Sequence, residues 1–441
     1  MSTGLGPFGQ GWNPPLPSGL HIPDGEARRM PDGRLYVYGS WDQQDDGFCS
    51  SEYCVVSTAD LVEWTDHGCS FDVRRVPWTA TPDATRWPGL DWTRPTSFME
   101  RMLAGGGEPA TPVGGLLYAP DAVHRDGRYF LYFCGSDESE GVAVADRPEG
   151  PFDDAVQLPC GGIDPAVLVD DDGGAYFYWG QFSANGVQLT DNMTSFVPGT
   201  TVEGLLTEEE HHFHEGTSIR RIGDLYYAVY ASIERGAPTT LSYATATSPL
   251  GPFEHRGVVI DNARCDPWSW NNHGSIERFG DRWYVFYHRS SRRSMSWRRL
   301  CIEPISFDDE GAIAEVPMTT QGPGRPLAAG DRIDGWRACE VAGGAFVGPG
   351  ESGREGLAMP PGSAAVFRWL ELDRRASSVE LEMERAGIVA LALGRDTPAV
   401  GAVEVWSGRG TGAIVLPPGR HELWLRNTGE DDVVVLDLVL R

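Results

Sequence analysis

Five short polar motifs recur along the chain, each placed just before a glycine turn that leads into an aromatic-rich segment. The motifs read HIPDGEA, LYAPDAV, GIDPAVL, HEGTSIR and NNHGSI. Their chemically capable residues are Asp24, Asp121, Asp164, Glu215 and His273, each six to nine positions ahead of its turn glycine. Similar offsets indicate equivalent positions in repeated units. We therefore expect four carboxylates and one imidazole to ring a single pocket.

Clustered carboxylates in a poorly solvated pocket repel one another, so at least one should hold a proton and be able to act as an acid. A pair of carboxyl groups, one acidic and one basic, is the equipment of glycoside hydrolysis. Taken singly, an Asp before Pro or Gly is more simply a turn residue that caps its own backbone. Recurrence at the same position of each repeat favours the chemical interpretation.

The segment EEEHHFHE suggests a second kind of site, because His212 and His214 have a spacing that metal ligands use. In a strand, however, alternate residues face opposite sides. Alternation would place Glu215 with His211 and Phe213 instead of with that pair. We therefore do not favour a transition-metal site in this segment.

The elements that must position the motifs are short strands. Five segments repeat a glycine turn and an aromatic-rich strand, at residues 32–40, 126–136, 171–180, 223–232 and 280–290. The turn glycines are 94, 46, 50 and 57 residues apart, and the last three steps match one four-stranded propeller blade. Residues 71–117, rich in Pro, Gly and Trp, account for the long first step as an insertion. This pattern predicts an all-β fold with a five-bladed β-propeller over residues 1–321; a Greek-key sandwich is the alternative.

A different pattern follows the glycine- and proline-rich linker at residues 322–330. Segments such as SSVELEME, HELWLRN and VVVLDLVLR alternate apolar and polar residues. This alternation predicts a second unit over residues 330–441, an antiparallel β-sandwich with a jelly-roll-like arrangement.

Composition excludes several classes of partner. The 441 residues carry 36 Lys and Arg against 63 Asp and Glu, a net charge of -27, which disfavours nucleic acid and anionic membranes. No apolar run approaches the length of a membrane span, and the N-terminal segment lacks the features of a signal peptide. We therefore expect a cytoplasmic protein. Its eight cysteines form no CxxC pair and are expected to be mostly buried thiols.

At these motifs the chain resembles glycoside hydrolase family 43, the five-bladed propeller family of α-L-arabinofuranosidases, β-xylosidases, arabinanases and galactosidases. The resemblance covers about residues 10–320. It implies that Asp24 is the general base and Glu215 the general acid of an inverting reaction. Asp164 would tune the proton affinity of that acid and orient it. One departure is Gly25, which stands where the family commonly has proline after the base.

The same resemblance implies that Asp121 lines the pocket and that His273 lies on the axis near a calcium ion or its water. Such an ion would be structural or electrostatic, and no organic cofactor is expected. The C-terminal segment PPGRHELWLRNTG resembles a carbohydrate-binding module of the family 6 type. For that unit we favour packing on the propeller over polysaccharide targeting.

Four further residues are predicted to bind substrate. Trp41 and Trp179 follow predicted inner strands and would supply aromatic surfaces for the apolar faces of a sugar. Gln181 and Arg289 complete the set of predicted substrate-binding residues.

Together these features predict an inverting exo-glycosidase that releases a terminal pentofuranose, with α-L-arabinofuranose as the favoured sugar, from oligosaccharides. A cytoplasmic enzyme would meet short imported fragments, and the insertion at residues 71–117 could close one end of a cleft. A β-xylosidase and a β-D-galactofuranosidase would share the mechanism and are the alternatives. A sugar-binding propeller without catalysis is the alternative from another class. The oligomeric state is left open.

Overall fold

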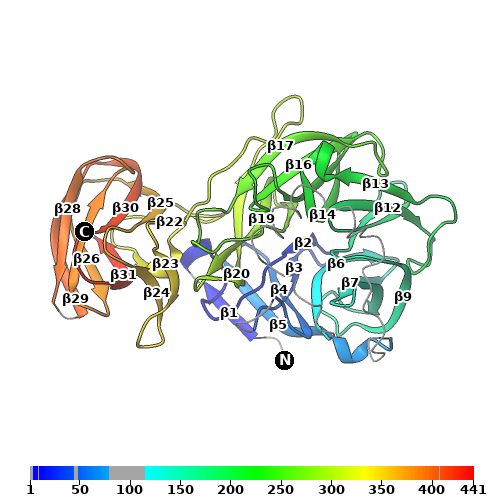
Figure 1. Ribbon diagram of the computed structural model, residues 1–441, viewed down its shortest axis with the longest axis horizontal. Coiled ribbons are helices and arrows are strands. Elements are labelled where there is room, and N and C mark those ends of the chain that lie inside the picture. The colour runs from blue at the N-terminus through cyan, green and yellow to red at the C-terminus, as the bar shows by residue number, and fades with distance from the viewer. Residues whose placement is uncertain (1–2, 8, 44–47, 79–114, 407) are drawn as a thin grey trace.

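The computed structural model describes residues 3–7, 9–43, 48–78, 115–406 and 408–441. Almost every element is a β-strand, and the strands form a five-bladed propeller with a second β-unit beside it (Figure 1). The predicted fold class is thereby confirmed. Most of the predicted insertion, at residues 79–114, lies outside the described residues.

Each blade is an antiparallel sheet. Blade one has the order β1-β5-β4-β3-β2, with β1 at Thr3–Pro7, β2 at Glu26–Arg29, β3 at Leu35–Gly39, β4 at Glu52–Thr58 and β5 at Glu63–Asp72. Blade two comprises β6 (Leu117–Arg125), β7 (Arg128–Gly135), β8 (Ser139–Ala145) and β9 (Asp153–Gly161). Blade three comprises β10 (Ala166–Val169), β11 (Ala175–Trp179), β12 (Ser183–Leu189) and β13 (Val202–Thr207). Blade four comprises β14 (Phe213–Ile222), β15 (Leu225–Ser232), β16 (Thr240–Ala246) and β17 (Glu254–Asp261). Blade five comprises β18 (Ser275–Phe279), β19 (Arg282–Ser291) and β20 (Ser294–Ile305).

The repeated glycine turns join the first two strands of each blade. Gly33 and Gly173, for example, both have φ of 85°, a left-handed conformation that a side chain disfavours. The strand that follows each turn is aromatic because both of its faces are buried between neighbouring blades. One apolar cluster joins blades one and two through Tyr38 and Phe133, and another joins blades five and one through Phe286 and Val37. These tyrosines and phenylalanines therefore pack the blades instead of lining a pocket.

The inner strands β2, β6, β10, β14 and β18 surround the axis and neighbour one another in that order. Buried ion pairs join them along the channel. Arg28 of β2 pairs with Asp121 of β6 at 2.5 Å, and Arg220 of β14 pairs with Glu26 at 2.6 Å and with Glu277 of β18 at 2.9 Å. These ion pairs connect neighbouring inner strands along the axis.

The second unit is a two-layered antiparallel sandwich whose sheets join at one corner. Its strands are β21 (Arg332–Asp334), β22 (Glu340–Ala342), β23 (Phe346–Pro349), β24 (Glu355–Met359), β25 (Ala364–Leu372), β26 (Ala376–Met383), β27 (Gly387–Ala392), β28 (Ala399–Val405), β29 (Gly408–Leu416), β30 (Gly419–Asn427) and β31 (Val433–Leu440). Short helices lie at Gly9–Gly11, Val73–Arg75, Glu208–His211 (α2) and Gly335–Arg337. The sandwich core includes Leu381 and Leu438 from one sheet and Phe367 and Leu423 from the other.

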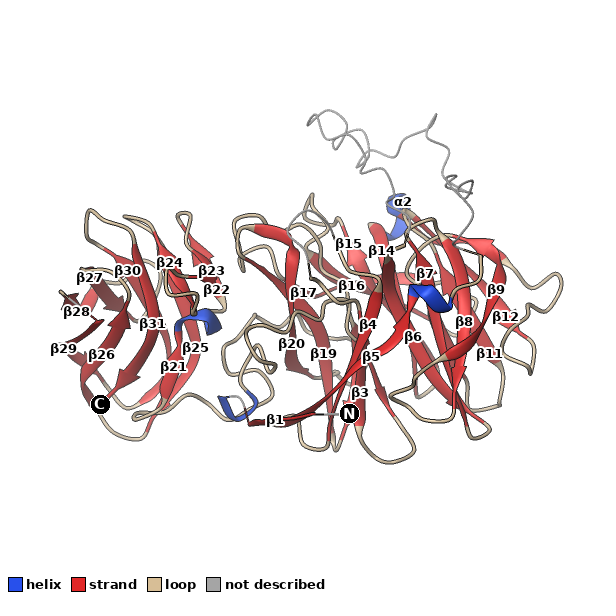
Figure 2. Cartoon of the chain, turned by 90° about the horizontal axis from the view of Figure 1, so that it is seen from below, coloured by secondary structure: helices blue, strands red, loops and turns tan. Residues whose placement is uncertain are grey.

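The two units lie side by side and are joined by buried contacts (Figure 2). Trp12, from the start of the chain, belongs to the core of the sandwich. The buried Arg337 donates hydrogen bonds to the carbonyls of Trp12 and Pro14 at 2.8 and 2.9 Å. Across the same junction, Glu355 accepts a hydrogen bond from Arg299 at 2.7 Å. Such contacts favour a fixed arrangement of the two units.

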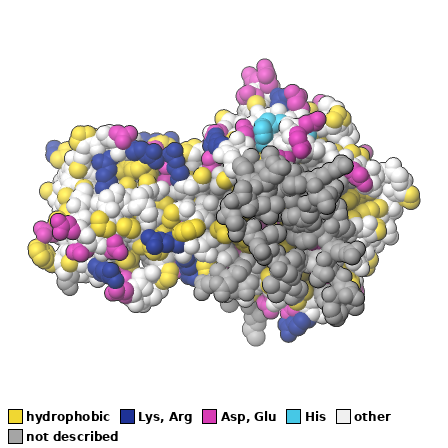
Figure 3. Space-filling model, in the orientation of Figure 1, with side chains coloured by type: hydrophobic (Ala, Val, Ile, Leu, Met, Phe, Trp, Pro, Cys, Tyr) yellow, Lys and Arg dark blue, Asp and Glu magenta, His cyan; other side chains and the backbone are white. Residues whose placement is uncertain are grey.

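On the face shown in Figure 3, acidic side chains are spread over both units instead of forming one patch. All eight cysteines are free, and six are buried, as predicted. No helix in the described part of the chain is long and apolar enough to cross a membrane.

Candidate active site

Four of the five motif residues meet at one end of the propeller axis. Asp24, Asp164 and His273 lie just before the inner strands β2, β10 and β18, and Glu215 lies near the start of β14. The helix α2, which directly precedes β14, marks this end in Figure 2. All four residues are buried. His273 joins two of them, because its Nδ1 lies 3.8 Å from Asp24 Oδ1 and 3.7 Å from Asp164 Oδ2.

Asp24 and Asp164 share an unusual backbone conformation, with φ of 56° and 57°. Aspartate tolerates this left-handed region better than most residues. Both residues are also nine positions ahead of their turn glycines. The two motifs are therefore structural equivalents in blades one and three.

Asp24 is held as an ionised carboxylate. Arg298 Nη1 donates to its Oδ1 at 2.8 Å, and the same guanidinium binds both oxygens of Asp42 at 3.0 Å. Burial alone would raise the pKa of Asp24, but the positive charge of Arg298, together with smaller contributions from His273 and His288, outweighs it and leaves that pKa below its usual value. A buried carboxylate that stays ionised can accept a proton from water.

Asp164 has the opposite character. Burial raises the pKa of Asp164 well above its usual range, and the nearby charges of Glu215 and Asp24 add to this effect. Its backbone N–H donates to Cys134 Sγ at 3.3 Å, which fixes it against blade two. The site therefore pairs an ionised aspartate with an acidic cluster that retains a proton.

Glu215 has amide donors on both of its oxygens. Gln181 Nε2 donates to Oε2 at 2.7 Å, and Asn271 Nδ2 lies 3.5 Å from Oε1. His214 Nε2 is 3.7 Å from Oε2, so the expectation that strand alternation separates Glu215 from this histidine is wrong. The reason is a register shift in β14 between Phe213 and Glu215.

A hydrogen-bonded chain links the surroundings of the two carboxylates. The Asp24 N–H donates to His288 Nδ1 at 3.3 Å, so the proton of the neutral ring lies on Nε2. Burial lowers the pKa of His288 to about 3, with the charge of Arg298 adding to the effect. The Nε2 of His288 donates to two acceptors on Asn271, the backbone oxygen at 3.0 Å and Oδ1 at 3.1 Å. This orients the amide so that its Nδ2 faces Glu215.

Asp121 is not part of this group, which corrects the prediction that it lines the pocket. Both of its oxygens accept from Arg28, and Oδ2 also accepts from the Val167 N–H at 2.7 Å. Asp121 is only six positions ahead of its turn glycine, whereas Asp24 is nine ahead of its own. It therefore lies deeper along the channel, where it belongs to the axial ion pairs.

Arg289 is also placed elsewhere. Its guanidinium contacts Tyr287 Oη at 2.6 Å, Glu303 Oε1 at 3.2 Å and the carbonyl of Thr319 at 2.7 Å. It neighbours His288 in β19 and so faces the opposite side of the strand. The prediction that it binds substrate is therefore not supported by its position.

The two predicted aromatic walls differ. Trp179 is buried and stacks on Phe177 and Phe196, with ring centroids 5.4 and 5.8 Å apart. It lines a cavity together with Gln181. Trp41 is half-buried and packs against the cluster between blades five and one.

Three residues of the site were missed in the sequence. Arg298 and Asp42 lie in no repeated motif. His288 lies in the fifth aromatic segment, one position from Arg289, and its identity as a histidine amid apolar residues was an available signal.

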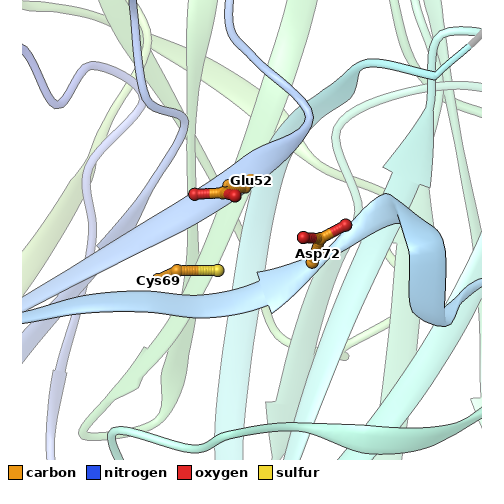
Figure 4. A group of neighbouring side chains, drawn as sticks. All are labelled: Glu52, Cys69 and Asp72. Atoms are coloured by element: carbon orange, nitrogen blue, oxygen red, sulfur yellow. The ribbon is translucent and has the colours of Figure 1, made fainter.

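The described side chains around His273 do not offer the set of oxygen ligands that calcium needs. Calcium takes about six to eight oxygen ligands, whereas Asp24 Oδ1 already binds Arg298. Among the described residues, one group of three metal-ligating side chains lies close together, and it is Glu52, Cys69 and Asp72 on blade one (Figure 4). Asp72 in that group is bound by Arg74. An ion near His273 stays a prediction.

Gly216 packs directly against the imidazole ring of His273. Gly216 has φ of 71°, and a Cβ there would lie 2.7 to 2.8 Å from ring atoms of His273. Gly216→Ala should therefore displace the imidazole from between the two aspartates and lower kcat by about 100-fold. Gly223→Ala is the matched control, because Gly223 has φ of 62° and nothing within 4 Å of a Cβ.

Both variants should lose about 1–2 kcal/mol of unfolding free energy to backbone strain. Kinetics and thermal unfolding measured side by side check this. Equal activities of the two variants would show that His273 does not need its observed position.

Comparisons with protein families, with characterised proteins and with solved structures agree on one family. Residues 23–313 match the glycosyl hydrolases family 43. A xylosidase/arabinosidase of Thermoclostridium stercorarium is 30% identical over 381 residues, which cover 75% of this chain and 72% of that protein. A β-xylosidase/α-arabinofuranosidase of the same family from a compost metagenome, solved with xylotriose in a calcium-free form, aligns with a TM-score of 0.54 and 25% identity. That alignment covers 72% of this chain and 99% of that one.

A second structure extends the likeness to both units. An arabinoxylan arabinofuranohydrolase of Bacillus subtilis, solved with cellotetraose, aligns with a TM-score of 0.52 at 22% identity over 98% of this chain and 97% of its own. The fold, the acidic ring at one end of its axis and these matches define a glycoside hydrolase built on a five-bladed propeller. The chain belongs to glycosyl hydrolase family 43, as its motifs indicated.

Proposed function

We propose that the protein is an inverting exo-glycosidase that releases terminal α-L-arabinofuranose from oligosaccharides. Asp24 is the general base, Glu215 the general acid, and Asp164 the residue that tunes the pKa of that acid and orients it. The observation that carries this assignment is the contrast between the aspartates. Arg298 keeps Asp24 ionised, whereas burial and neighbouring carboxylates favour the protonated form of Asp164.

The reaction follows from these protonation states. Asp24 takes a proton from a water molecule as the water oxygen bonds to the anomeric carbon. The glycosidic C–O bond breaks, and its electron pair passes to the leaving oxygen, which takes the proton of Glu215. Attack on the face opposite the leaving group inverts the configuration. Asp24 then carries a proton and Glu215 a charge, and exchange of one proton with solvent restores the starting state.

The relatives support the sugar class. Those of Thermoclostridium stercorarium and Humicola insolens are named xylosidase/arabinosidase, the latter at 28% identity over 361 residues. A β-D-galactofuranosidase of Aspergillus niger is 28% identical over 290 residues, and galactofuranose and β-xylose are the alternative sugars.

We also propose that residues 1–321 form the catalytic unit and residues 330–441 a unit that stabilises it. The support is the shared packing at the junction. Cys339, Val366 and Trp424 of the second unit belong to one apolar cluster with Tyr287 of blade five.

A panel of nitrophenyl glycosides tests the proposed sugar. The α-L-arabinofuranoside should give a higher kcat/KM than the β-D-xylopyranoside and the β-D-galactofuranoside. The reverse order would favour an alternative enzyme of the same mechanism. Hydrolysis of none of the three would favour a sugar-binding propeller.

A further inference from the structure

A groove of about 480 Å³ runs between blades two and three at the end of the propeller that holds the site. Its walls come from the end of β9, from Trp179 at the end of β11, and from Thr201 and Glu203 at β13. Its volume lies in the range of sites for small molecules.

The groove adjoins Glu215 on one side. Gln181 lines the groove and also donates to Glu215 Oε2 at 2.7 Å. Gly162 and Ile163, which precede Asp164 directly, line it as well. In the proposed reaction Glu215 protonates the leaving oxygen, so whatever is attached to that oxygen departs from this side.

Glu138 is the buried polar group of the groove. It is 3% exposed, and its Oε1 has no hydrogen-bond partner among the described residues. Its own backbone carbonyl accepts from the Gly162 N–H at 2.9 Å, which fixes Glu138 against the segment that carries Asp164. A buried carboxyl oxygen without a partner is costly to the folded protein unless a ligand satisfies it.

The chemistry of the lining indicates the class of ligand. Burial, with the charge of Asp137 adding to it, raises the pKa of Glu138 to about 8, so near neutral pH this group can donate as well as accept a hydrogen bond. Asn185 and Thr201 add an amide and a hydroxyl, and Trp179 and Phe196 add apolar surface. The described residues of the lining include two glutamates and no Lys, Arg or His, which disfavours an anionic ligand.

We propose that this groove binds the neutral, hydroxyl-rich glycosyl unit that leaves with the oxygen protonated by Glu215, and that Glu138 hydrogen-bonds its hydroxyls. The inference rests on the proposed function and names the leaving-group side of the same site. Glu138 is thereby a specificity residue for a sugar leaving group, and an aryl leaving group without hydroxyls does not use it.

Glu138→Met tests this, because it keeps the size of the side chain and removes its polar atoms. KM for an arabinofuranosyl-xylobiose should rise about tenfold, and KM for nitrophenyl α-L-arabinofuranoside should stay unchanged. Glu138→Gln should restore most of the binding. Thr201→Trp is a second variant at an exposed edge of the groove, and it should raise KM for the oligosaccharide alone.

Glu140→Met is the matched control. Among the described residues, Glu140 is likewise buried with unpartnered carboxyl oxygens, but it does not line the groove, so any change in KM should be the same for both substrates. Equal effects of Glu138→Met on both substrates, or none on either, would overturn the inference alone. If the wild type cleaved neither substrate, the proposed function would fail and the inference with it.

Discussion

Asp24→Asn should abolish hydrolysis of oligosaccharides and of activated aryl glycosides alike. No group then activates the attacking water, and this step is required whatever the leaving group. Glu215→Gln should lose most activity on oligosaccharides and keep much of it on a dinitrophenyl glycoside, because that phenolate departs without a proton. General acid–base contributions of about 10²–10⁴-fold make the contrast measurable as a ratio of kcat/KM values.

Asp121→Asn serves as a comparison for this pair, because Asp121 lies deeper in the channel and binds Arg28. Its loss should lower stability and affect both substrates in the same proportion. If Glu215→Gln and Asp24→Asn reduced activity equally on both substrate types, the acid and base roles would be misassigned.

Arg298→Met should have the largest effect on stability. Arg298 is 2% exposed in its side chain and is paired with Asp24 at 2.8 Å and with Asp42 at 3.0 Å. Removing the cation leaves two buried carboxylates, and breaking such a pair costs about 3–5 kcal/mol of unfolding free energy. Chemical denaturation of the variant measures this loss.

The same substitution should change the pH profile. Without the charge of Arg298, burial raises the pKa of Asp24, so the base becomes ionised only at higher pH. The acidic limb of kcat/KM should therefore move to higher pH. Adding Asp42→Asn should recover part of the stability and leave the acidic limb shifted. An acidic limb identical to that of the wild type would show that Arg298 does not set the state of Asp24.

The repeat explains why much of the site could be predicted. Equal nine-residue offsets placed Asp24 and Asp164 at equivalent positions of two blades, and the structure gives them almost the same φ. The offset of six residues at Asp121 was the signal that it lies deeper. Treating all five offsets as equivalent was therefore the source of that error.

The rest of the site depends on contacts between segments distant in sequence. Arg298 reaches Asp24 across 274 positions and His288 reaches it across 264. No local pattern marks such a pair, because each partner lies on a different blade and only closure of the ring brings them together. Alternation in β19 then decides that His288, and not the neighbouring Arg289, faces the axis.

The stereochemistry of the first product tests the central claim most directly. Proton NMR spectra recorded during the first minutes of hydrolysis of nitrophenyl α-L-arabinofuranoside report the anomer that leaves the enzyme before it equilibrates. The account predicts β-L-arabinofuranose, because Asp24 directs water to the face opposite the leaving group. Initial release of the α-anomer would mean a covalent intermediate and a retaining reaction, and would contradict the assignment of Asp24 as the base.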